Sequence, residues 1–455
     1  MEVFERSFEE SVASLETMLR NGRMTRFRTE FLALHNYDQA KIFAEFDSEE
    51  RQKVYQYLAP GEIADVFDAF ESDNIQLSEG YFLEMENSYA AAVLGEMFAD
   101  NAVDILNSIE NKEKVNIYMH LMPNTSAREI SQLINYIDET AGAIMTTEFV
   151  TIQEEFTVKQ AYDHLKGAAQ QAETIYYVYV VDEDNRLKGV ISLRDLIVNE
   201  DDSLISDILN NRLITVQVND DQVEVAKMVQ DYDLLALPVV GFDHELLGII
   251  TVDDVLDVMQ EEADSDYSGL AAVDVNENHA TPIQASKSRL PWLVTLLFLG
   301  MGTASLISQF EGLISTAPVL SSFVTLITGT AGNAGTQSLA VAIRKLTNKS
   351  EEDAFFASFW FELLTGVVTG LVVGIVIAFV ASIWKGNLFL GIIIGVAMAS
   401  AIVVANLAGS LIPKVMVKFG FDPAVASGPF ISTLSDLTSV FIYFTIASLF
   451  LSHLS

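Results

Sequence analysis

The chain has 455 residues, of which half are hydrophobic, with 26 basic and 63 acidic side chains and no cysteine. A formal net charge of −37 argues against nucleic acid as a partner, because phosphate contacts require lysine and arginine, and it favours cations. The lack of cysteine excludes disulfides and thiolate chemistry, and neither a P-loop nor a His-Glu-x-x-His motif nor a nucleophile elbow is present, so we do not expect an enzyme.

The first 140 residues are predicted to form an all-α domain. Apolar residues recur at spacings of three and four, as in Ile63, Val66 and Phe67, and the pattern breaks at Pro60. A succession of short amphipathic helices is typical of a small superhelix.

The middle region contains an internal repeat. Residues 179–196 match residues 238–255 at an offset of 59 residues. Each copy predicts a strand, a polar turn, a second strand and a helix capped by Ser192 or Thr251, and each follows an amphipathic helix. Duplication at this period indicates paired α/β units.

The second copy leads into an acidic helix. Asp254 and Asp257 share one helix face, and Glu261 and Glu262 continue it by one turn. Acids on facing surfaces repel each other unless divalent cations bridge them. The charge could also serve only to keep a large domain soluble, and that alternative stays open here.

The charge changes sharply after residue 289. Residues 1–289 carry 20 basic and 56 acidic side chains, whereas residues 290–455 carry 6 and 7. The second part contains five apolar segments, each long enough for a bilayer crossing, which takes roughly 20 residues. The predicted spans are Leu290–Gln309, Pro318–Ile343, Ala354–Trp384, Leu388–Ile412 and Ala424–Leu451.

Basic residues in the short flanking segments predict the orientation. No apolar run near the N-terminus could act as a signal peptide, so the acidic part is expected in the cytoplasm and the C-terminus outside the cell membrane. The outer side then receives only Lys385. The inner side receives Lys287, Arg289, Arg344, Lys345, Lys349, Lys414 and Lys418.

Two carboxylates, Glu362 and Asp436, lie within otherwise apolar spans, where a charge is expensive unless it faces water or a partner. Ser432 precedes Asp436 by one turn on the same helix face, and hydroxyls that end in a carboxylate are typical of a pore lining. The alternative for both acids is a structural group hydrogen-bonded to neighbouring helices, and Arg344 or Lys345 could neutralise Glu362.

Residues 331–337 of the second span are expected to interrupt or loosen its helix, and irregular backbone at this depth is tolerated only where it lines a cavity or is buried in protein. Asn333, Thr336 and Gln337 offer neutral oxygens there, and Asn406 adds an amide in the fourth span. Oxygen ligands with few carboxylates suit a hard cation, particularly Mg2+, which keeps several waters. A homodimer with its axis along the pore doubles the carboxylates.

Glycines at positions 366, 370 and 374 recur every four residues in the third span. They place a smooth stripe on one helix face, where a second helix can approach closely. Internal packing is the favoured interpretation of this stripe.

The three parts in this order resemble the MgtE family of Mg2+ transporters and channels, over essentially the whole chain, and the repeat resembles a tandem CBS pair. The resemblance implies a homodimer in the lipid bilayer, with a superhelical domain (1–140), an α/β CBS pair (141–263), a connecting plug helix (264–289) and five membrane helices (290–455). The motifs that carry it are Ala141–Glu148, Glu173–Tyr177, Asp231–Val239, Gly332–Gln337 and Phe421–Phe430.

The resemblance also implies ligand residues. In the family the pore lies between the second and fifth helices of both subunits, and the Asp of the fifth helix, here Asp436, binds hydrated Mg2+. Cytoplasmic Mg2+ sites at domain and subunit interfaces carry over to Asp100, Asp104, Asp233, Asp254, Asp257, Glu262 and Asp266.

A nucleotide site is implied by the Gly-x-x-[Ser/Thr]-x-x-Asp run that both repeats keep, at Gly189 and at Gly248. A helix cap and turn without any ligand is the alternative. ATP contacts in related proteins point to Tyr177, Ser192, Arg194 and Asp195.

The predicted function is a Mg2+-selective channel or transporter for uptake, modulated by ATP at the CBS pair. High intracellular Mg2+ would hold the acidic domains compact and press residues 262–272 against the pore. Two alternatives remain: a transporter of another divalent cation such as Co2+ or Mn2+, and a membrane-anchored nucleotide sensor in which Asp436 has no role.

Overall fold

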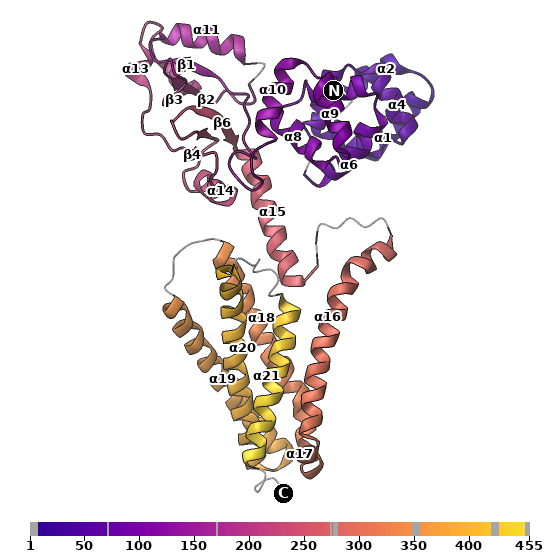
Figure 1. Ribbon diagram of the computed structural model, residues 1–455, viewed down its shortest axis with the longest axis vertical. Coiled ribbons are helices and arrows are strands. Elements are labelled where there is room, and N and C mark those ends of the chain that lie inside the picture. Colours follow the sequence, from indigo (N-terminus) through magenta and orange to yellow (C-terminus); the bar gives the residue numbers. More distant parts are fainter. Residues whose placement is uncertain are drawn as a thin grey trace. The chain divides into compact units, whose positions relative to one another are not determined.

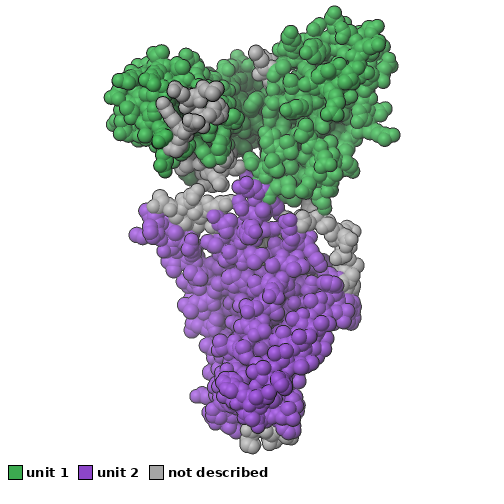
Figure 2. Space-filling model, turned by 180° about the vertical axis from the view of Figure 1, so that it is seen from behind, with its two compact units in different colours: residues 1–259 green, residues 260–455 purple. Residues whose placement is uncertain are grey.

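The computed structural model describes residues 8–70, 72–169, 172–273, 275, 281–347, 355–419 and 427–450. The chain forms two compact units, residues 1–259 and 260–455, coloured green and purple in Figure 2. Several predicted features lie wholly or partly outside the described residues: Lys349, Ala354 at the start of the third span, residues 421–426 of the last quoted motif, both ends of the predicted fifth span, and part of the connecting segment.

The first unit begins with a helical superhelix (Figure 1). Alternate helices pack on each other: α3 on α5, α5 on α7, and α6 on α8. The predicted apolar positions form its core, since Ile63, Val66 and Phe67 are buried, and α5 begins at Pro60. The helices are α1 (Phe8–Arg20), α2 (Met24–Phe31), α3 (Asn36–Glu45), α4 (Ser48–Tyr57), α5 (Pro60–Phe67), α6 (Ser72–Glu84), α7 (Asn87–Leu94), α8 (Ala99–Ser108), α9 (Lys112–Leu121) and α10 (Asn124–Leu133).

Two three-stranded sheets follow, one for each repeat. In both sheets the first strand is parallel to the second and the second is antiparallel to the third, with a register shift at positions 59 residues apart. The first repeat contains β1 (Thr151–Gln153), α11 (Val158–Ala168), β2 (Tyr177–Val181), β3 (Leu187–Ser192), α12 (Leu193–Val198) and α13 (Ile205–Ile208). The second contains β4 (Val216–Gln217), α14 (Gln222–Asp231), β5 (Ala236–Val240), β6 (Leu246–Thr251) and α15 (Val252–Ala271).

The two repeats pair through their equivalent turns. The Leu187 amide donates to the His244 carbonyl at 3.1 Å, and the Leu246 amide donates to the Asn185 carbonyl at 3.0 Å. Asn185 and His244 both have a positive φ, of 61°, so the same left-handed turn residue occurs in each copy. The repeat predicted from sequence is therefore a structural repeat with approximate two-fold symmetry.

The second unit is built from long helices, and α20 lies between α18 and α19 (Figure 1). Helix α21 packs on α16, α18 and α20. The elements are α16 (Pro282–Gln309), α17 (Glu311–Thr316), the 3-10 helix η2 (Pro318–Leu320), α18 (Ser321–Thr347), α19 (Phe355–Lys385), α20 (Leu388–Lys418) and α21 (Gly428–Leu449).

Each predicted span coincides with one of these long helices. Within the described residues, four are long and apolar enough to cross a membrane: α16, α19, α20 and α21. Helix α18, the predicted second span, has 27 residues but carries the polar run 331–337.

The expected interruption of this helix is wrong, because α18 runs unbroken from Ser321 to Thr347. The physical reason is close packing. A Cβ on Gly332 would lie 2.9 Å from the Ser432 hydroxyl of α21, and one on Gly335 would lie 3.0 Å from the Ser435 hydroxyl. Contacts of this kind outweigh the low helix propensity of glycine.

The glycine stripe of α19 has the predicted packing role. A Cβ on Gly370 would lie 2.7 Å from the Ala399 carbonyl oxygen, and one on Gly374 would lie 2.6 Å from the Gly395 carbonyl oxygen. Both oxygens belong to the backbone of α20, so the two helices are in direct main-chain contact along this stripe.

We expect the change Gly374→Val to destabilise the membrane unit, because its Cβ needs space that the α20 backbone occupies. A loss of about 1–3 kcal/mol is the usual cost of such overpacking. Thermal unfolding of the purified protein in detergent measures it. The matched control is Gly300→Val on α16, where a Cβ would meet nothing within 4 Å. Equal effects of the two changes would contradict the packing role.

The predicted connecting segment 264–289 is not a helix of its own. Its first part continues α15 without a break from the second CBS repeat, and its last part is the beginning of α16. Residues 274 and 276–280, between these two helices, lie outside the described residues.

Candidate functional site

The approximate symmetry of the CBS pair creates two equivalent positions. In one, Val190 and Asn210 exchange two backbone hydrogen bonds of 3.0 Å. In the other, Ile249 and Thr146 exchange the same pair, at 2.8 and 3.0 Å. Asn210 is therefore the counterpart of Thr146, and Arg212, two residues later, is the counterpart of Glu148.

The two positions carry opposite charges. Arg194 corresponds to Asp253 at the repeat offset, just as Arg212 corresponds to Glu148. We call one position the basic half-site and the other the acidic half-site. The basic half-site comprises Ser192, Arg194, Asp195, Asn210 and Arg212; the acidic half-site comprises Glu148, Glu173, Thr251, Asp253 and Asp254.

The acidic half-site brings three carboxyl groups together. Asp100 at the start of α8, Glu173 before β2 and Asp254 in α15 each offer an oxygen within 4.8 Å of the others. The Thr251 hydroxyl lies 2.5 Å from an Asp254 oxygen and 3.3 Å from a Glu173 oxygen. The second oxygen of Glu173 is buried, and no described residue forms a hydrogen bond with it.

Burial raises the pKa of these carboxyl groups. The pKa of Glu173 rises to about 7, first through burial and then through the Asp254 charge. That of Asp254 rises to about 6, mainly through burial. The pKa of Asp100 lies well above its ordinary value, again through burial, with the charges of Glu173 and Asp254 next. Three acids that are buried or half-buried, with no basic side chain in the cluster, are the arrangement that a hard cation stabilises.

Two further acids hold α8 in place. The Ala99 amide donates to Glu148 at 3.2 Å, and the Phe98 amide donates to Asp68 at 3.3 Å. Glu148 also accepts from the Thr146 hydroxyl at 2.6 Å. These bonds satisfy amides at the start of α8, which otherwise have no partner within the helix, and so position Asp100.

The other acids of the first part of the chain that were predicted as metal ligands lie outside this cluster. Asp104, Asp233 and Asp257 are exposed. Glu262 and Asp266 are half-buried on the second half of α15. Glu173 was missed as a ligand, although it belongs to one of the motifs that carried the resemblance.

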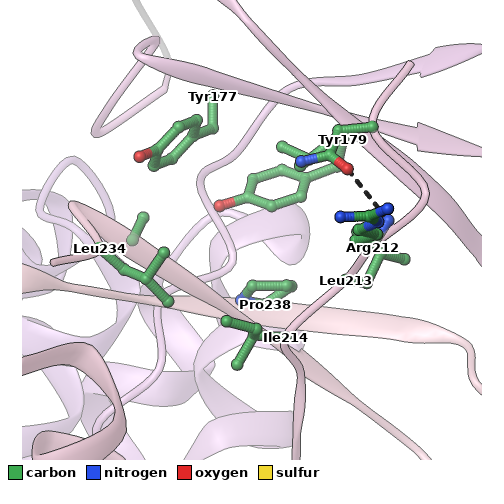
Figure 3. A pocket seen from close by; sticks show the side chains of 10 residues that line it. Tyr177, Tyr179, Arg212, Leu213, Ile214, Leu234 and Pro238 are labelled. Atoms are coloured by element: carbon green, nitrogen blue, oxygen red, sulfur yellow. Dashed lines mark hydrogen bonds between the residues drawn. The ribbon is translucent and has the colours of Figure 1, made fainter. Parts of the chain in front are cut away.

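The basic half-site opens into a cavity of about 490 Å³. Predicted residues Tyr177, Ser192 and Arg194 line it, together with Leu235. Asp195 instead forms a capping box, in which its carboxylate accepts from the Ser192 hydroxyl at 2.6 Å and from the Ser192 amide at 3.0 Å. A second cavity, of about 210 Å³, is lined by Tyr177, Arg212 and other residues (Figure 3).

In the membrane unit, Asp436 and Ser432 of α21 face α18 at a glycine. A Cβ on Gly332 would lie 3.8 Å from an Asp436 oxygen. Asn333 and Gln337, on the same polar run, are exposed in this single chain, and Thr336 is half-buried with its hydroxyl donating to the Gly332 carbonyl at 3.0 Å.

Glu362 and Asn406 form a separate group, buried among α18, α19 and α20. The Asn406 amide donates to the Glu362 carboxylate and to its carbonyl, both at 3.0 Å, and the Ser338 hydroxyl donates to the carboxylate at 3.2 Å. Lys345, which was predicted together with Arg344 as a possible neutralising partner, places its ammonium group over the Phe361 ring, 5.2 Å from the ring centroid. This geometry favours the structural interpretation of Glu362.

Comparison with known proteins identifies the family. Residues 324–446 match the family described as "Divalent cation transporter", residues 34–139 match the "MgtE intracellular N domain", and residues 141–200 and 205–261 match the CBS domain. The chain is 58% identical over 446 residues to the magnesium transporter MgtE of Enterococcus faecalis, which spans 98% of each chain. The chain belongs to the MgtE family. It is also 35% identical to MgtE of Bacillus subtilis, over 98% of this chain and 99% of that one.

Two solved structures have a fold similar to that of the first part of this chain. The soluble part of a magnesium transporter is 52% identical, with a TM-score of 0.54, and covers 56% of this chain and 100% of its own. The cytosolic domain of the Mg2+ channel MgtE in complex with ATP is 34% identical, with a TM-score of 0.51, and covers 54% and 99%.

Membership of the MgtE family confirms several predictions. The fold class is confirmed: a helical first domain, a CBS pair with mixed sheets and a membrane part of long apolar helices. The family is one of transporters rather than enzymes, and a multi-pass membrane location follows from it.

The raised pKa values predict a link between pH and stability in the MgtE chain. Without metal, Glu173, Asp254 and Asp68 (pKa about 7, raised by burial) hold protons in the folded state up to pH 6–7, whereas in the unfolded chain they lose them near pH 4. The folded state therefore binds more protons in this window. Its stability falls as pH rises from about 4 to 7.

Mg2+ should reverse this trend, because it binds the deprotonated carboxylates. Thermal unfolding in a chelator should show a falling midpoint between pH 5.5 and pH 7.5, whereas the gain on adding Mg2+ should increase over the same range. A gain from Mg2+ that is equal at both pH values would contradict this coupling.

Proposed function

We propose that this chain is a Mg2+ channel of the cell membrane that mediates Mg2+ uptake and closes when intracellular Mg2+ is high. The observation that carries the pore is the position of Asp436 and Ser432 on α21 against Gly332 of α18. A carboxylate at membrane depth is expensive unless it serves an ion path, and hydroxyls beside it suit a cation that keeps its waters.

The pore is completed in this proposal by a second copy of the chain. One Asp436 per chain is too few for a divalent ion at membrane depth, and a two-fold axis along the pore doubles it. Asn333 and Gln337, exposed on α18, would then face the ion path together with Thr336. Their neutral oxygens can hydrogen-bond the waters of a hydrated ion.

Gating is proposed to act through the acidic half-site and α15. Asp254 lies near the beginning of this 20-residue helix, which spans roughly 30 Å. Near its end, the Leu270 carbonyl oxygen would lie 2.9 Å from a Cβ on Gly428, the first residue of α21. Leu270 also packs with Leu339 of α18 and Ile431 of α21. Ion binding at one end can thus bias the helices that carry the pore groups.

The remaining acids of α15 extend this gate. Asp257, Glu262 and Asp266 are proposed, with Asp104 and Asp233, to bind further Mg2+ ions at domain or subunit surfaces. Bound cations would hold the acidic parts compact and press residues 262–272 against the pore. The same proposal divides the chain after residues 140, 263 and 289, into the superhelical domain, the CBS pair, the connecting segment and the membrane domain.

ATP is proposed to bind at the basic half-site. Arg194 and Arg212 supply positive charge there, whereas the equivalent position of the acidic half-site has Asp253 and Glu148. A polyphosphate is attracted by the arginines of the basic half-site and repelled by the carboxylates of the acidic half-site. The similar cytosolic domain described in complex with ATP supports this assignment.

The orientation proposed from the basic residues places the acidic part in the cytoplasm and the C-terminus outside. Membrane potential then drives entry of the cation, with roughly 4.6 kcal/mol per 100 mV for a divalent ion.

Current recordings from the reconstituted protein test the function. Mg2+ should carry current, and internal Mg2+ should suppress it.

Competing ions separate the alternatives in the same recording. Co2+ or Mn2+ current that exceeds Mg2+ current would assign the protein to another divalent cation. No current with any of these ions, together with retained ATP binding, would favour a membrane-anchored nucleotide sensor.

A further inference from the structure

The 210 Å³ cavity between the two CBS repeats has mainly apolar walls (Figure 3). They come from strands β2 and β3, from residues 210–214, and from β5 together with Leu234 just before it. Leu213, Ile214, Leu234 and Pro238 contribute apolar side chains, and Tyr177 contributes an aromatic ring. Apolar and aromatic walls of this kind suit a flat ring.

Tyr179 contributes a hydroxyl to this lining, beside the polar side chains of Asn210 and Arg212. Its side chain is only 1% exposed, and its hydroxyl is buried with no hydrogen-bond partner among the residues that the structure describes. In Figure 3 the hydroxyl points into the space between Tyr177 and Leu234. A buried hydroxyl with no partner reduces stability, so its presence in a cavity needs a reason.

The Tyr179 ring is held firmly in this position. Its backbone amide donates to the Val150 carbonyl at 3.0 Å within the sheet, and its ring packs edge-on against Phe149 with centroids 5.9 Å apart. The hydroxyl is therefore preorganised and does not need to be ordered by a ligand.

The size and position of the cavity fit the base of a nucleotide. A cavity of about 150 Å³ holds benzene, so 210 Å³ offers room for a larger, fused ring. Tyr177 lines both this cavity and the 490 Å³ cavity that contains Arg194. A ligand can thus place its ring in the smaller cavity and its anionic part in the larger one.

We propose that the Tyr179 hydroxyl hydrogen-bonds the polar edge of the nucleobase, and so makes this site select a nucleotide by its base. The inference rests on the ATP binding proposed above. A site with a buried polar group rejects ligands that leave that group unpaired, which gives one hydroxyl a large effect on specificity.

The test is the change Tyr179→Phe in the full-length protein in detergent, at constant Mg2+. Titration calorimetry should show about 5–10-fold weaker ATP binding, the size expected for one hydrogen bond. Binding of inorganic tripolyphosphate, which has no base, should be unchanged. The unfolding midpoint without nucleotide should stay the same or rise, because the variant removes an unpaired buried hydroxyl.

The matched control is Tyr162→Phe, which removes the same atom from an exposed tyrosine on α11, outside both cavities. It should leave ATP affinity unchanged. Equal ATP affinity of Tyr179→Phe and the unsubstituted protein would overturn the inference and leave the nucleotide proposal standing. Equal weakening of ATP and tripolyphosphate, or a lower unfolding midpoint, would assign Tyr179 a structural role and overturn it. Absence of ATP binding by the unsubstituted protein would overturn both proposals.

Discussion

Replacement of Asp436 by asparagine is expected to abolish Mg2+ uptake, with at least a tenfold loss of flux. The change keeps the size of the side chain and removes the charge that a divalent ion requires at membrane depth. Asp436 lies against Gly332 of α18. Because glycine has no side chain, no side chain at this position of α18 covers the carboxylate. Growth rescue of a Mg2+-dependent strain and flux into proteoliposomes both measure the effect.

The control for this prediction is Ser439→Ala on the same helix. Ser439 is fully buried and its hydroxyl has no hydrogen-bond partner in the described part of the chain, so its loss should leave uptake intact. Both variants should reach the membrane in equal amounts. Normal flux through Asp436→Asn would refute the proposed pore.

Sequence periodicity was sufficient to predict most of the fold. Ile63, Val66 and Phe67 lie in the core of the superhelix as their spacing indicated, and the 59-residue repeat reappears as two sheets of identical topology. These features follow from local patterns that survive folding. The backbone of α18 was predicted wrongly, because propensity describes an isolated segment, whereas Gly332 and Gly335 are held by contacts with other helices.

The acidic half-site was only partly predictable. Asp100 and Asp254 were expected as metal ligands, but 154 positions separate them in the sequence and nothing local shows that they meet. A comparison of the repeats could have singled out Glu173. Its counterpart at the offset of 59 is Tyr232, so the carboxylate occurs in only one of the two copies. The contrast between Glu148 and Arg212 required the backbone pairing of Thr146 and Asn210, which is visible only in three dimensions.

The change Glu173→Gln is expected to remove most of the stabilisation that Mg2+ gives to the first unit. A ligand at 100 times its Kd stabilises a protein by about 2.7 kcal/mol, which corresponds to about 5–10 °C in the unfolding midpoint. The amide cannot replace the carboxylate that meets Asp100 and Asp254, so the Mg2+-induced shift should fall severalfold. Thermal unfolding and limited proteolysis of the full-length protein, each with and without Mg2+, measure the loss.

Without Mg2+ the same variant should be more stable than the unsubstituted protein, because it removes one of three closely spaced carboxylates that repel each other. A merely structural glutamate would give the opposite sign. Asp184→Asn is the control, since it makes the same charge change in an exposed turn of the first repeat. If Glu173 closes the channel through bound Mg2+, its glutamine variant should also conduct at internal Mg2+ concentrations that silence the unsubstituted protein. A variant that keeps the full Mg2+ shift and normal closure would remove the acidic half-site from the gate and leave that role to the other acids of α15.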